Sequence, residues 1–408
     1  MGPGRPEGIG PPHAGAAARL QPPQRCPEGR GHSQQHSKPI PMMRNLLAVL
    51  TLAALCGLLA CRSSRKAPGD VLTAAQLRPL GRTALAGAGL ELISSGAHFG
   101  FRFKGPACTV YASVPGWLDH NYLQYELDGR YHPVRLRVSK GGANALRIEA
   151  PGDGDHTVWL FKATEATTGP VFIQEVRATG VIAVAQSDAT PLIEFIGNSI
   201  TCGAASDTSE VPCGAGFYHD QHNAYLAYGP RVARALGARF ILSSVSGIGI
   251  YRSWNARGPS MPAVYDRLRL QEQDSVPWDT SRQRPQVISI ALGTNDLSDG
   301  DGAGPRAPFD SALFTGRYIE FVRRLQLRNP RAQIVLLGSP MTGGAKGQLL
   351  ERCLSAVKAQ VDKGRAARVA LYFFRPMTPR GCTWHPDVED HALLAGELTP
   401  FFSNLLQR

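Results

Sequence analysis

The chain has 408 residues, of which 43% are hydrophobic and 19% are charged. That length allows one large or two medium-sized domains, and the apolar content excludes wholesale disorder and a small disulfide-stapled scaffold. The formal net charge is +12, but residues 62–408 hold 38 Lys and Arg against 30 Asp and Glu. Because these charges are scattered, the sequence indicates no nucleic-acid partner.

The first sixty residues differ from the rest of the chain. Residues 1–42 carry nine Pro and seven Gly without a hydrophobic period, which indicates a disordered segment or a wrongly assigned start. Residues 43–61 join a basic start, Arg44, to a long apolar run, which is typical of a secretory signal. It is the one apolar run that could reach a bilayer, so a multi-span membrane protein is excluded.

The end of that run resembles a bacterial lipobox, Leu58-Leu59-Ala60-Cys61. The resemblance implies that Cys61 is diacylated and anchors the chain to a membrane of the cell envelope. The alternative is an ordinary cleaved signal, which would leave the protein secreted or periplasmic. In either case we expect export.

Residues 62–71 are a polar tether, and residues 72–186 show short alternating runs broken by turns. Phe99–Phe103 alternates apolar and other side chains, and Asp128-Gly129 supplies turn chemistry. Many short strands at close spacing without a helical period predict an all-β sandwich, of the jelly-roll kind.

Residues 187–408 alternate strands with helices instead, which predicts a doubly wound α/β domain with a parallel sheet. One helix is expected over 224–236, with Gly229-Pro230 as a point where it kinks or restarts. The remaining expected elements are strands 191–196, 239–244, 286–292, 333–338 and 367–374, and helices 309–328, 346–363 and 388–406.

Four polar clusters follow these strands or precede the last helix, where ligands of α/β sheets bind. They contain Ser199, Gly247, Asn295 and His385. A serine hydroxyl can act as a nucleophile, a glycine N–H and an asparagine amide can bind an oxyanion, and a histidine can act as general base. Taken singly, each has a structural alternative: a helix cap, a bare turn, an Asn-Asp turn and a structural histidine.

The order Ser, Gly, Asn, His resembles the SGNH (GDSL-type) hydrolase superfamily, which implies an esterase with a flavodoxin-like three-layer domain. With a β-sandwich ahead of it, the chain resembles carbohydrate esterase family 2, the acetyl xylan esterases. The segments that carry this resemblance are Glu194–Gly203, Lys162–Ala166, Ser246–Arg252, Leu292–Asp296 and Trp384–Pro386.

The resemblance implies roles for individual residues. Ser199 is the nucleophile and His385 the general base. The backbone N–H groups of Ser199 and Gly247 form the oxyanion hole with the Asn295 amide, and Arg252 and Trp384 line the substrate cleft. No metal ion and no organic cofactor is expected.

Two positions depart from the superfamily pattern. Asn198 stands where an Asp usually precedes the nucleophile, and we expect it to keep the hydrogen-bond acceptor. The triad Asp is missing, because Cys382 and Thr383 occupy its two possible positions. Some relatives use a Ser-His dyad with a backbone carbonyl orienting the imidazole, and we expect this here; Asp387 or Asp390 could substitute only if the loop doubled back.

These observations predict an exported serine esterase that removes O-acetyl groups from a polysaccharide or oligosaccharide through an acyl-enzyme. One alternative is a surface glycan-binding lipoprotein whose hydrolase fold is inactive. Another is a lipase or peptidoglycan O-acetylesterase on the same fold. The sequence does not decide the glycan, the hydroxyl or the oligomeric state.

The disulfide pairing also stays open. The cysteines that remain after the leader are Cys108, Cys202, Cys213, Cys353 and Cys382. An odd number leaves at least one free thiol within a chain, and both Cys202–Cys213 and Cys353–Cys382 are feasible pairs. No Cys or His spacing typical of zinc is present.

Overall fold

The computed structural model describes residues 70–407, except 88, 187–190, 256, 282 and 364–368. The expected disordered start, the signal with Cys61 and most of the polar tether lie outside the described residues. Among the helices that the structure describes, none is both long enough and apolar enough to cross a bilayer.

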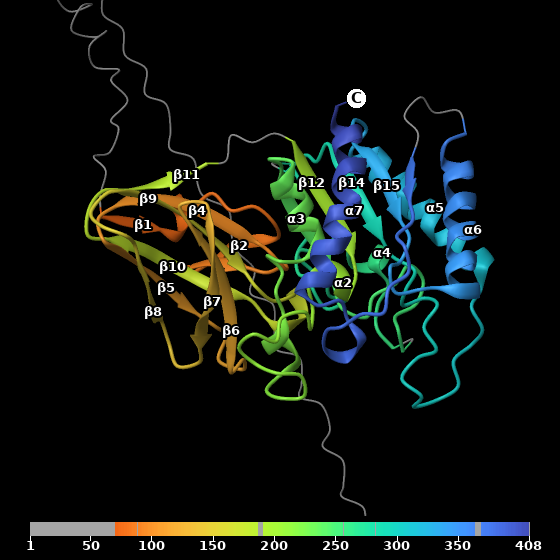
Figure 1. The fold of residues 1–408 in the computed structure, drawn as a ribbon, viewed down its shortest axis with the longest axis horizontal. Coiled ribbons are helices and arrows are strands. Elements are labelled where there is room, and N and C mark those ends of the chain that lie inside the picture. The colour runs from red at the N-terminus through yellow and green to blue at the C-terminus, as the bar shows by residue number, and fades with distance from the viewer. Residues whose placement is uncertain are drawn as a thin grey trace, which may run out of the picture. The chain divides into compact units, whose positions relative to one another are not determined.

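The N-terminal half is a pair of antiparallel sheets, drawn in orange and yellow in Figure 1. Phe99, Phe101 and Phe103 are buried and project to the same side of one strand, as the alternating pattern predicted. One sheet contains β1 (Val71–Thr73), β2 (Thr83–Ala86), β3 (Gly89–Leu92), β5 (Ala107–Ser113), β8 (Asn144–Glu149) and β10 (Val171–Ala178). The other contains β4 (His98–Lys104), β6 (His120–Leu127), β7 (Arg130–Ser139), β9 (Asp155–Lys162) and β11 (Ile182–Ala185).

The C-terminal half is built on a five-stranded parallel sheet in the order β13-β12-β14-β15-β16. This is the flavodoxin-like order, in which the first strand lies between the second and the third. The strands are β12 (Leu192–Gly197), β13 (Arg239–Ser244), β14 (Val287–Ala291), β15 (Gln333–Leu337) and β16 (Ala370–Tyr372).

Helices cover both faces of this sheet, which confirms the three-layer prediction (Figure 1). Ile193 and Phe195 of β12 pack in one core with α3 (Tyr228–Ala235) and α7 (Val388–Leu406). Leu192 and Ile196 pack in another core with α5 (Ser311–Arg328) and α6 (Gly344–Val361). Shorter elements are α2 (Ser199–Cys202), α4 (Met261–Val264), η1 (Ala74–Gln76), η2 (Ala166–Thr168), η3 (Tyr218–Gln221) and η4 (Cys382–Trp384).

Helix α3 begins four residues later than the helix expected over 224–236. Pro230 lies in the first turn of α3, where backbone N–H groups make no hydrogen bond within the helix, so a residue without an N–H is tolerated there. The helix therefore neither kinks nor restarts at Gly229-Pro230: residues 224–227 are not helical, and α3 begins at Tyr228.

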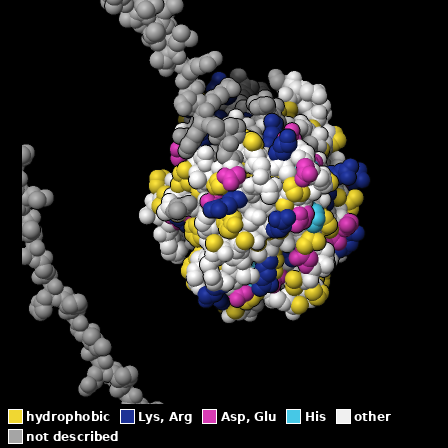
Figure 2. Space-filling model, turned by 90° about the vertical axis from the view of Figure 1, so that its left-hand side faces the viewer, with side chains coloured by type: hydrophobic (Ala, Val, Ile, Leu, Met, Phe, Trp, Pro, Cys, Tyr) yellow, Lys and Arg dark blue, Asp and Glu magenta, His cyan; other side chains and the backbone are white. Residues whose placement is uncertain are grey.

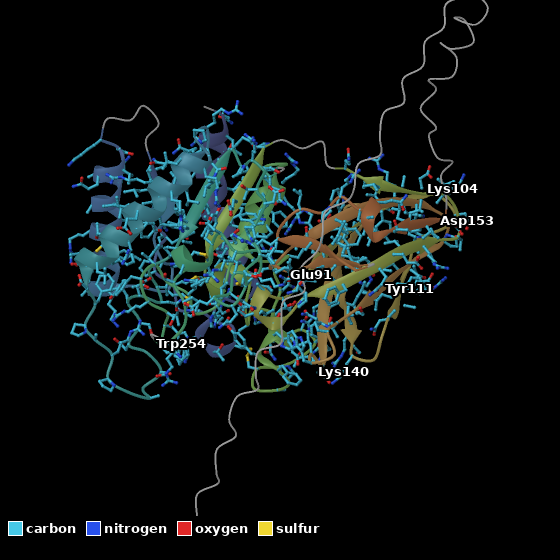
Figure 3. All side chains as sticks on the ribbon, turned by 180° about the vertical axis from the view of Figure 1, so that it is seen from behind. Glu91, Lys104, Tyr111, Lys140, Asp153 and Trp254 are labelled. Atoms are coloured by element: carbon cyan, nitrogen blue, oxygen red, sulfur yellow. A yellow bond between two sulfur atoms is a disulfide. The ribbon has the colours of Figure 1, made fainter. Side chains whose placement is uncertain are left out.

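The two halves share buried polar contacts. Arg82, fully buried, donates hydrogen bonds to the Tyr265 and Arg267 carbonyls at 3.0 and 2.7 Å, and burial lowers its pKa to about 10. Glu91, labelled in Figure 3, forms an ion pair with Arg269 at 2.6 Å. On the surface, Figure 2 shows basic and acidic side chains interspersed over the sandwich end.

Neither disulfide considered from the sequence forms. Cys213 pairs with Cys382, with their Cα atoms 5.3 Å apart, while Cys108, Cys202 and Cys353 are buried free thiols. Cys202 lies on α2 with its Sγ 3.2 Å from Ser244 Oγ, and Cys353 packs into the core from α6. The pairs Cys202–Cys213 and Cys353–Cys382 were wrong because burial in the sheet packing directs both helical thiols away from the loops.

Candidate active site

The predicted nucleophile lies where β12 meets α2. Asn198 caps the helix, and its Oδ1 accepts a hydrogen bond from the Ile200 N–H at 3.0 Å. Ser199 is the first helical residue and is 7% exposed. The expectation that Asn198 keeps the acceptor of the usual Asp is confirmed, so the loop keeps its cap without a charge.

The second predicted cluster requires glycine for a steric reason. Gly247 has a φ of +75°, and a Cβ on it would lie 2.5 Å from Cδ1 of Trp254. The Gly247 carbonyl accepts the Trp254 N–H at 2.8 Å, which folds the loop back on itself. A side chain at this position would therefore displace the indole ring or the loop backbone.

The glycine loop is held in place by Asn295 and Asp296, which follow β14. Nδ2 of Asn295 donates to the Ile248 carbonyl at 2.8 Å. Asp296 is fully buried, and one of its carboxylate oxygens accepts from the N–H groups of Ile250 and Tyr251 at 3.0 and 2.9 Å. Burial raises the pKa of Asp296, although backbone hydrogen bonds oppose the shift. From the sequence, Asp296 was expected only in a turn or as a helix cap.

The predicted base is held by carbonyl groups. Nδ1 of His385 lies 2.9 Å from the Thr383 carbonyl oxygen and 3.3 Å from that of Cys382. Thr383 and Trp384 both adopt positive φ values, 50° and 60°, which turn these groups toward the ring. Burial lowers the pKa of His385 below its ordinary value, while the carbonyl hydrogen bonds act in the opposite direction.

Other titratable groups near His385 in the sequence are engaged elsewhere. Asp387 caps α7 and accepts from the Asp390 N–H at 2.7 Å, and Asp390 pairs with Arg380 at 2.8 Å. His391 is fully buried, and its Nδ1 accepts from the Tyr228 N–H at 3.3 Å. These contacts leave Nδ1 of His385 facing the two carbonyl groups and the Thr383 hydroxyl, whose Oγ1 lies 3.1 Å away and itself donates to the Cys382 carbonyl.

The structure gathers the predicted residues around one cleft of about 810 Å³, within the range of small-ligand sites. Ser199, Gly247, Asn295, Trp384 and His385 all line it.

Arg252 is not among the residues that line this cleft. It lines a separate hollow of about 480 Å³, and its guanidinium donates to the Asp296 and Ala307 carbonyls at 2.8 and 2.6 Å.

Aromatic side chains that the sequence did not single out also line the cleft. Trp254 and Tyr218 are 40% and 41% exposed, and the Tyr218 ring centroid lies 6.2 Å from that of His385. Figure 3 shows Trp254 among the loops at the carboxyl end of the sheet. With Trp384, 77% exposed, they give the cleft apolar faces beside its polar groups.

A carboxylate from the sandwich half reaches the glycine loop. Glu165, at the end of the Lys162–Ala166 segment, accepts the Ser246 N–H at 2.6 Å, directly before Gly247. Its other oxygen lies 3.5 Å from Nε2 of His222. Burial acts to raise the pKa of Glu165, but hydrogen bonds and the charge of His222 outweigh it and hold the pKa at about 2.

Lys162 also holds this segment, through hydrogen bonds to its backbone. It is fully buried, and its Nζ donates to the Glu165 carbonyl at 2.7 Å and to the Thr164 carbonyl at 3.0 Å. Burial lowers the pKa of Lys162 to about 7. The sequence marked this segment through its family resemblance, but it gave no sign that Glu165 contacts a loop eighty residues away.

A flavodoxin-like sheet with a serine and a histidine on its carboxyl-end loops is the framework of a GDSL-type acyl hydrolase. Residues 195–391 match the GDSL-like lipase/acylhydrolase family, and residues 80–186 match the N-terminal module of carbohydrate esterase 2. The chain belongs to carbohydrate esterase family 2 and is a carboxylic ester hydrolase.

Individual relatives agree with this assignment. The chain is 30% identical to an acetylxylan esterase/glucomannan deacetylase of Cellvibrio japonicus over 307 residues, which cover 74% of this chain and 82% of that protein. It resembles the solved family two carbohydrate esterase of Clostridium thermocellum in complex with cellohexaose, with 26% identity, a TM-score of 0.71 and coverage of 83% and 99%. The solved family two esterase of Cellvibrio japonicus gives 26% identity and a TM-score of 0.72, covering 83% and 98%.

Proposed function

We propose that this chain is an exported esterase that removes acetyl groups from a polysaccharide through a Ser199–His385 dyad. The observation that carries the proposal is the hydrogen bonding of His385, whose Nδ1 faces two backbone carbonyls. Nδ1 must then carry the proton, which leaves Nε2 as the basic nitrogen. Deacetylation as the reaction is supported by the acetylxylan esterase relatives.

In the proposed reaction, His385 takes the proton of the Ser199 hydroxyl as its oxygen attacks the acetyl carbonyl. The tetrahedral oxyanion receives hydrogen bonds from the N–H groups of Ser199 and Gly247 and from the Asn295 amide. His385 then gives its proton to the sugar oxygen, and the sugar leaves. Water, activated by the same imidazole, releases acetate from Ser199.

The walls of the cleft fit a sugar substrate. Rings of Trp384, Trp254 and Tyr218 offer flat apolar surfaces for the C–H faces of a pyranose, and the exposed Lys346–Asp299 ion pair at 2.6 Å offers polar contacts. The relative from Clostridium thermocellum was solved with cellohexaose, which supports a β-linked glycan as the polymer class.

Acetate release from acetylated xylan and acetylated glucomannan tests the proposal. We expect the wild type to release acetate, Ser199→Ala to lose at least about 10³-fold in rate, and the exposed Ser209→Ala control to match the wild type. Aryl acetate, butyrate and octanoate esters test the lipase alternative. Faster turnover of the longer chains would contradict the acetyl-sugar assignment.

No acetate release by the wild type from any of these substrates would refute the esterase proposal. If the same protein still bound cellohexaose in affinity electrophoresis, the glycan-binding alternative would replace the esterase proposal. Export and the lipid anchor at Cys61 are tested by globomycin-sensitive processing and by Cys61→Ala. A Cys61→Ala variant that is still processed and stays membrane-bound would rule out lipidation.

A further inference from the structure

A cluster of two histidines and an aspartate lies apart from the residues that line the cleft, where strand β6 meets η3. Nε2 of His120 is 2.5 Å from Oδ1 of Asp220, and Nε2 of His219 is 4.0 Å from the same oxygen. One ligand atom from each of the three residues lies within 4.8 Å of the others. Their side chains are 1%, 12% and 6% exposed, in the order His120, His219, Asp220.

The hydrogen bonds of the cluster leave one buried nitrogen without a partner. Nε2 of His219 has no hydrogen-bond partner among the described residues, although water does not reach it. Burial of such an atom is costly unless something binds it. Nδ1 of His120 faces the Asp119 carboxylate at 2.7 Å, and its Nε2 faces Asp220. A carboxylate behind an imidazole is the usual outer partner of a metal-bound histidine.

We propose that His120, His219 and Asp220 bind one divalent cation of the zinc class, with water completing the coordination. Two imidazoles and a carboxylate suit Zn²⁺, whose ligand atoms in a tetrahedral site lie roughly 3.3 Å apart given bonds of about 2.0–2.1 Å. The short His120–Asp220 separation and the longer His219–Asp220 separation bracket this value. Binding replaces the proton between His120 and Asp220 with the metal and releases it to solvent.

The charges around the cluster are of both signs. Buried Arg135 donates to the Asp220 carbonyl at 2.7 Å, and Glu210 pairs with it at 3.1 Å. Asp220 and Asp119 supply negative charge, and Asp220 Oδ2 accepts the Phe217 N–H at 2.8 Å, which fixes the carboxylate. Arg137 lies 3.3 Å from Asp119 and 3.0 Å from Nδ1 of His120, but its side chain is 52% exposed and can turn into solvent. Among the three proposed ligands, the His219 side chain is the most exposed, at 12%.

The cation would join the two halves of the protein at the loop that carries Tyr218. His120 comes from the sandwich, while His219 and Asp220 belong to the segment that holds Tyr218 at the cleft. The site is structural, because it supplies no group to the ester bond and lies outside the cleft residues. This inference therefore does not depend on the proposed esterase reaction.

Metal uptake by purified protein without a polyhistidine tag tests the inference. After EDTA treatment and dialysis, we expect one Zn²⁺ per chain by mass spectrometry of the metal, micromolar or tighter affinity by calorimetry, and a melting temperature raised by about 3–6 °C in excess Zn²⁺. His219→Ala should weaken binding at least about 30-fold. It should fold, because Nε2 of His219 makes no hydrogen bond in the described structure.

The matched control is His156→Ala. Nδ1 of His156 is 2.8 Å from Oδ2 of Asp128, and its buried Nε2 also lacks a partner, but it belongs to no three-residue cluster among the described residues. We expect this variant to bind zinc as the wild type does. Equal zinc uptake by His219→Ala, loss of uptake in His156→Ala, or no uptake of Zn²⁺, Co²⁺ or Ni²⁺ by the wild type would each overturn the proposal and leave the esterase proposal untouched.

Discussion

Glu165→Gln separates a catalytic positioning role from simple attachment of the two halves. The Glu165 carboxylate accepts the Ser246 N–H and faces His222, and Ser246 precedes the proposed oxyanion donor Gly247. Glutamine keeps the shape and one acceptor oxygen but removes the charge. We expect kcat to fall about 10-fold with little change in KM, because the glycine loop contacts the transition state more closely than the bound ester.

The effect on stability can be estimated from the pKa of Glu165. A folded value of about 2 against an ordinary value near 4.5 corresponds to about 3 kcal/mol. Because the folded pKa is depressed, this stabilisation is present above about pH 4.5 and is lost as the pH falls toward 2. Glutamine forfeits it, so Glu165→Gln should lower the free energy of unfolding at pH 7 by about 2–4 kcal/mol.

Kinetics on an aryl acetate and urea unfolding at pH 7 provide the assay, with Glu91→Gln as control. Glu91 is also a buried sandwich carboxylate that pairs with the α/β half, but it does so through Arg269, whereas Glu165 contacts the glycine loop at Ser246. Both variants should lose stability, and Glu165→Gln alone should lose kcat. The charge of Glu165 raises the pKa of His385, so its removal should also move the acid limb of kcat to lower pH. Equal kinetic parameters in the two variants would show that Glu165 only connects the two halves of the protein.

Three further results are expected. Cys213→Ser removes the disulfide to Cys382, which lies three residues before His385. The change should lower the free energy of unfolding in urea by about 2–5 kcal/mol and reduce kcat. An unchanged kcat would show that the His385 loop keeps its conformation without the disulfide. The acid limb of the pH profile of kcat/KM should have its midpoint below 6.5, because burial lowers the pKa of His385 and the neutral imidazole is the proposed base. A midpoint above 7 would contradict this. Gly247→Ala should lower kcat/KM by about 10²-fold by displacing one proposed oxyanion donor, and a loss under threefold on an aryl acetate would contradict that role of Gly247.

Much of the fold was predictable because its signals are local. The alternation in Phe99–Phe103 and the buried strand ending at Ile196 follow from side-chain periodicity, and both are confirmed. Strand-to-helix loops converge at one sheet edge, so Ser199, Gly247 and Asn295 were expected near one another, and they line the same cleft. Their chemical roles stay predictions.

Contacts between distant segments were not predictable. Glu165 reaches Ser246, and His120 reaches Asp220, across 81 and 100 residues. No spacing in the sequence predicts that either pair is in contact. The disulfide was missed for the same reason. Even Asp296 gave no local sign that it accepts backbone hydrogen bonds from the glycine loop. Such residues become visible once the sandwich and the sheet are packed together.

The contacts around His385 explain how the proposed dyad could work without a triad carboxylate. An Asp in a triad holds the imidazole tautomer and stabilises the imidazolium ion. Here the Thr383 and Cys382 carbonyls perform the first task, and two successive residues with positive φ keep them aimed at Nδ1. That backbone is strained for residues other than glycine, and the disulfide at Cys382 restrains it.

The second task falls to charges farther away. The carbonyl dipoles stabilise the imidazolium less than a carboxylate would. Glu165, whose pKa is held at about 2, raises the pKa of His385 through space, although the neighbouring His222 lowers that pKa by more. The sandwich half thus contributes a negative charge that the triad position lacks. If the carbonyls and the distant charge share these two tasks, a Thr383→Asp change should move the midpoint of the acid limb of kcat/KM to higher pH. It should also reduce the loss of kcat that Glu165→Gln causes. Additive effects of the two changes would show that Glu165 acts on the glycine loop alone.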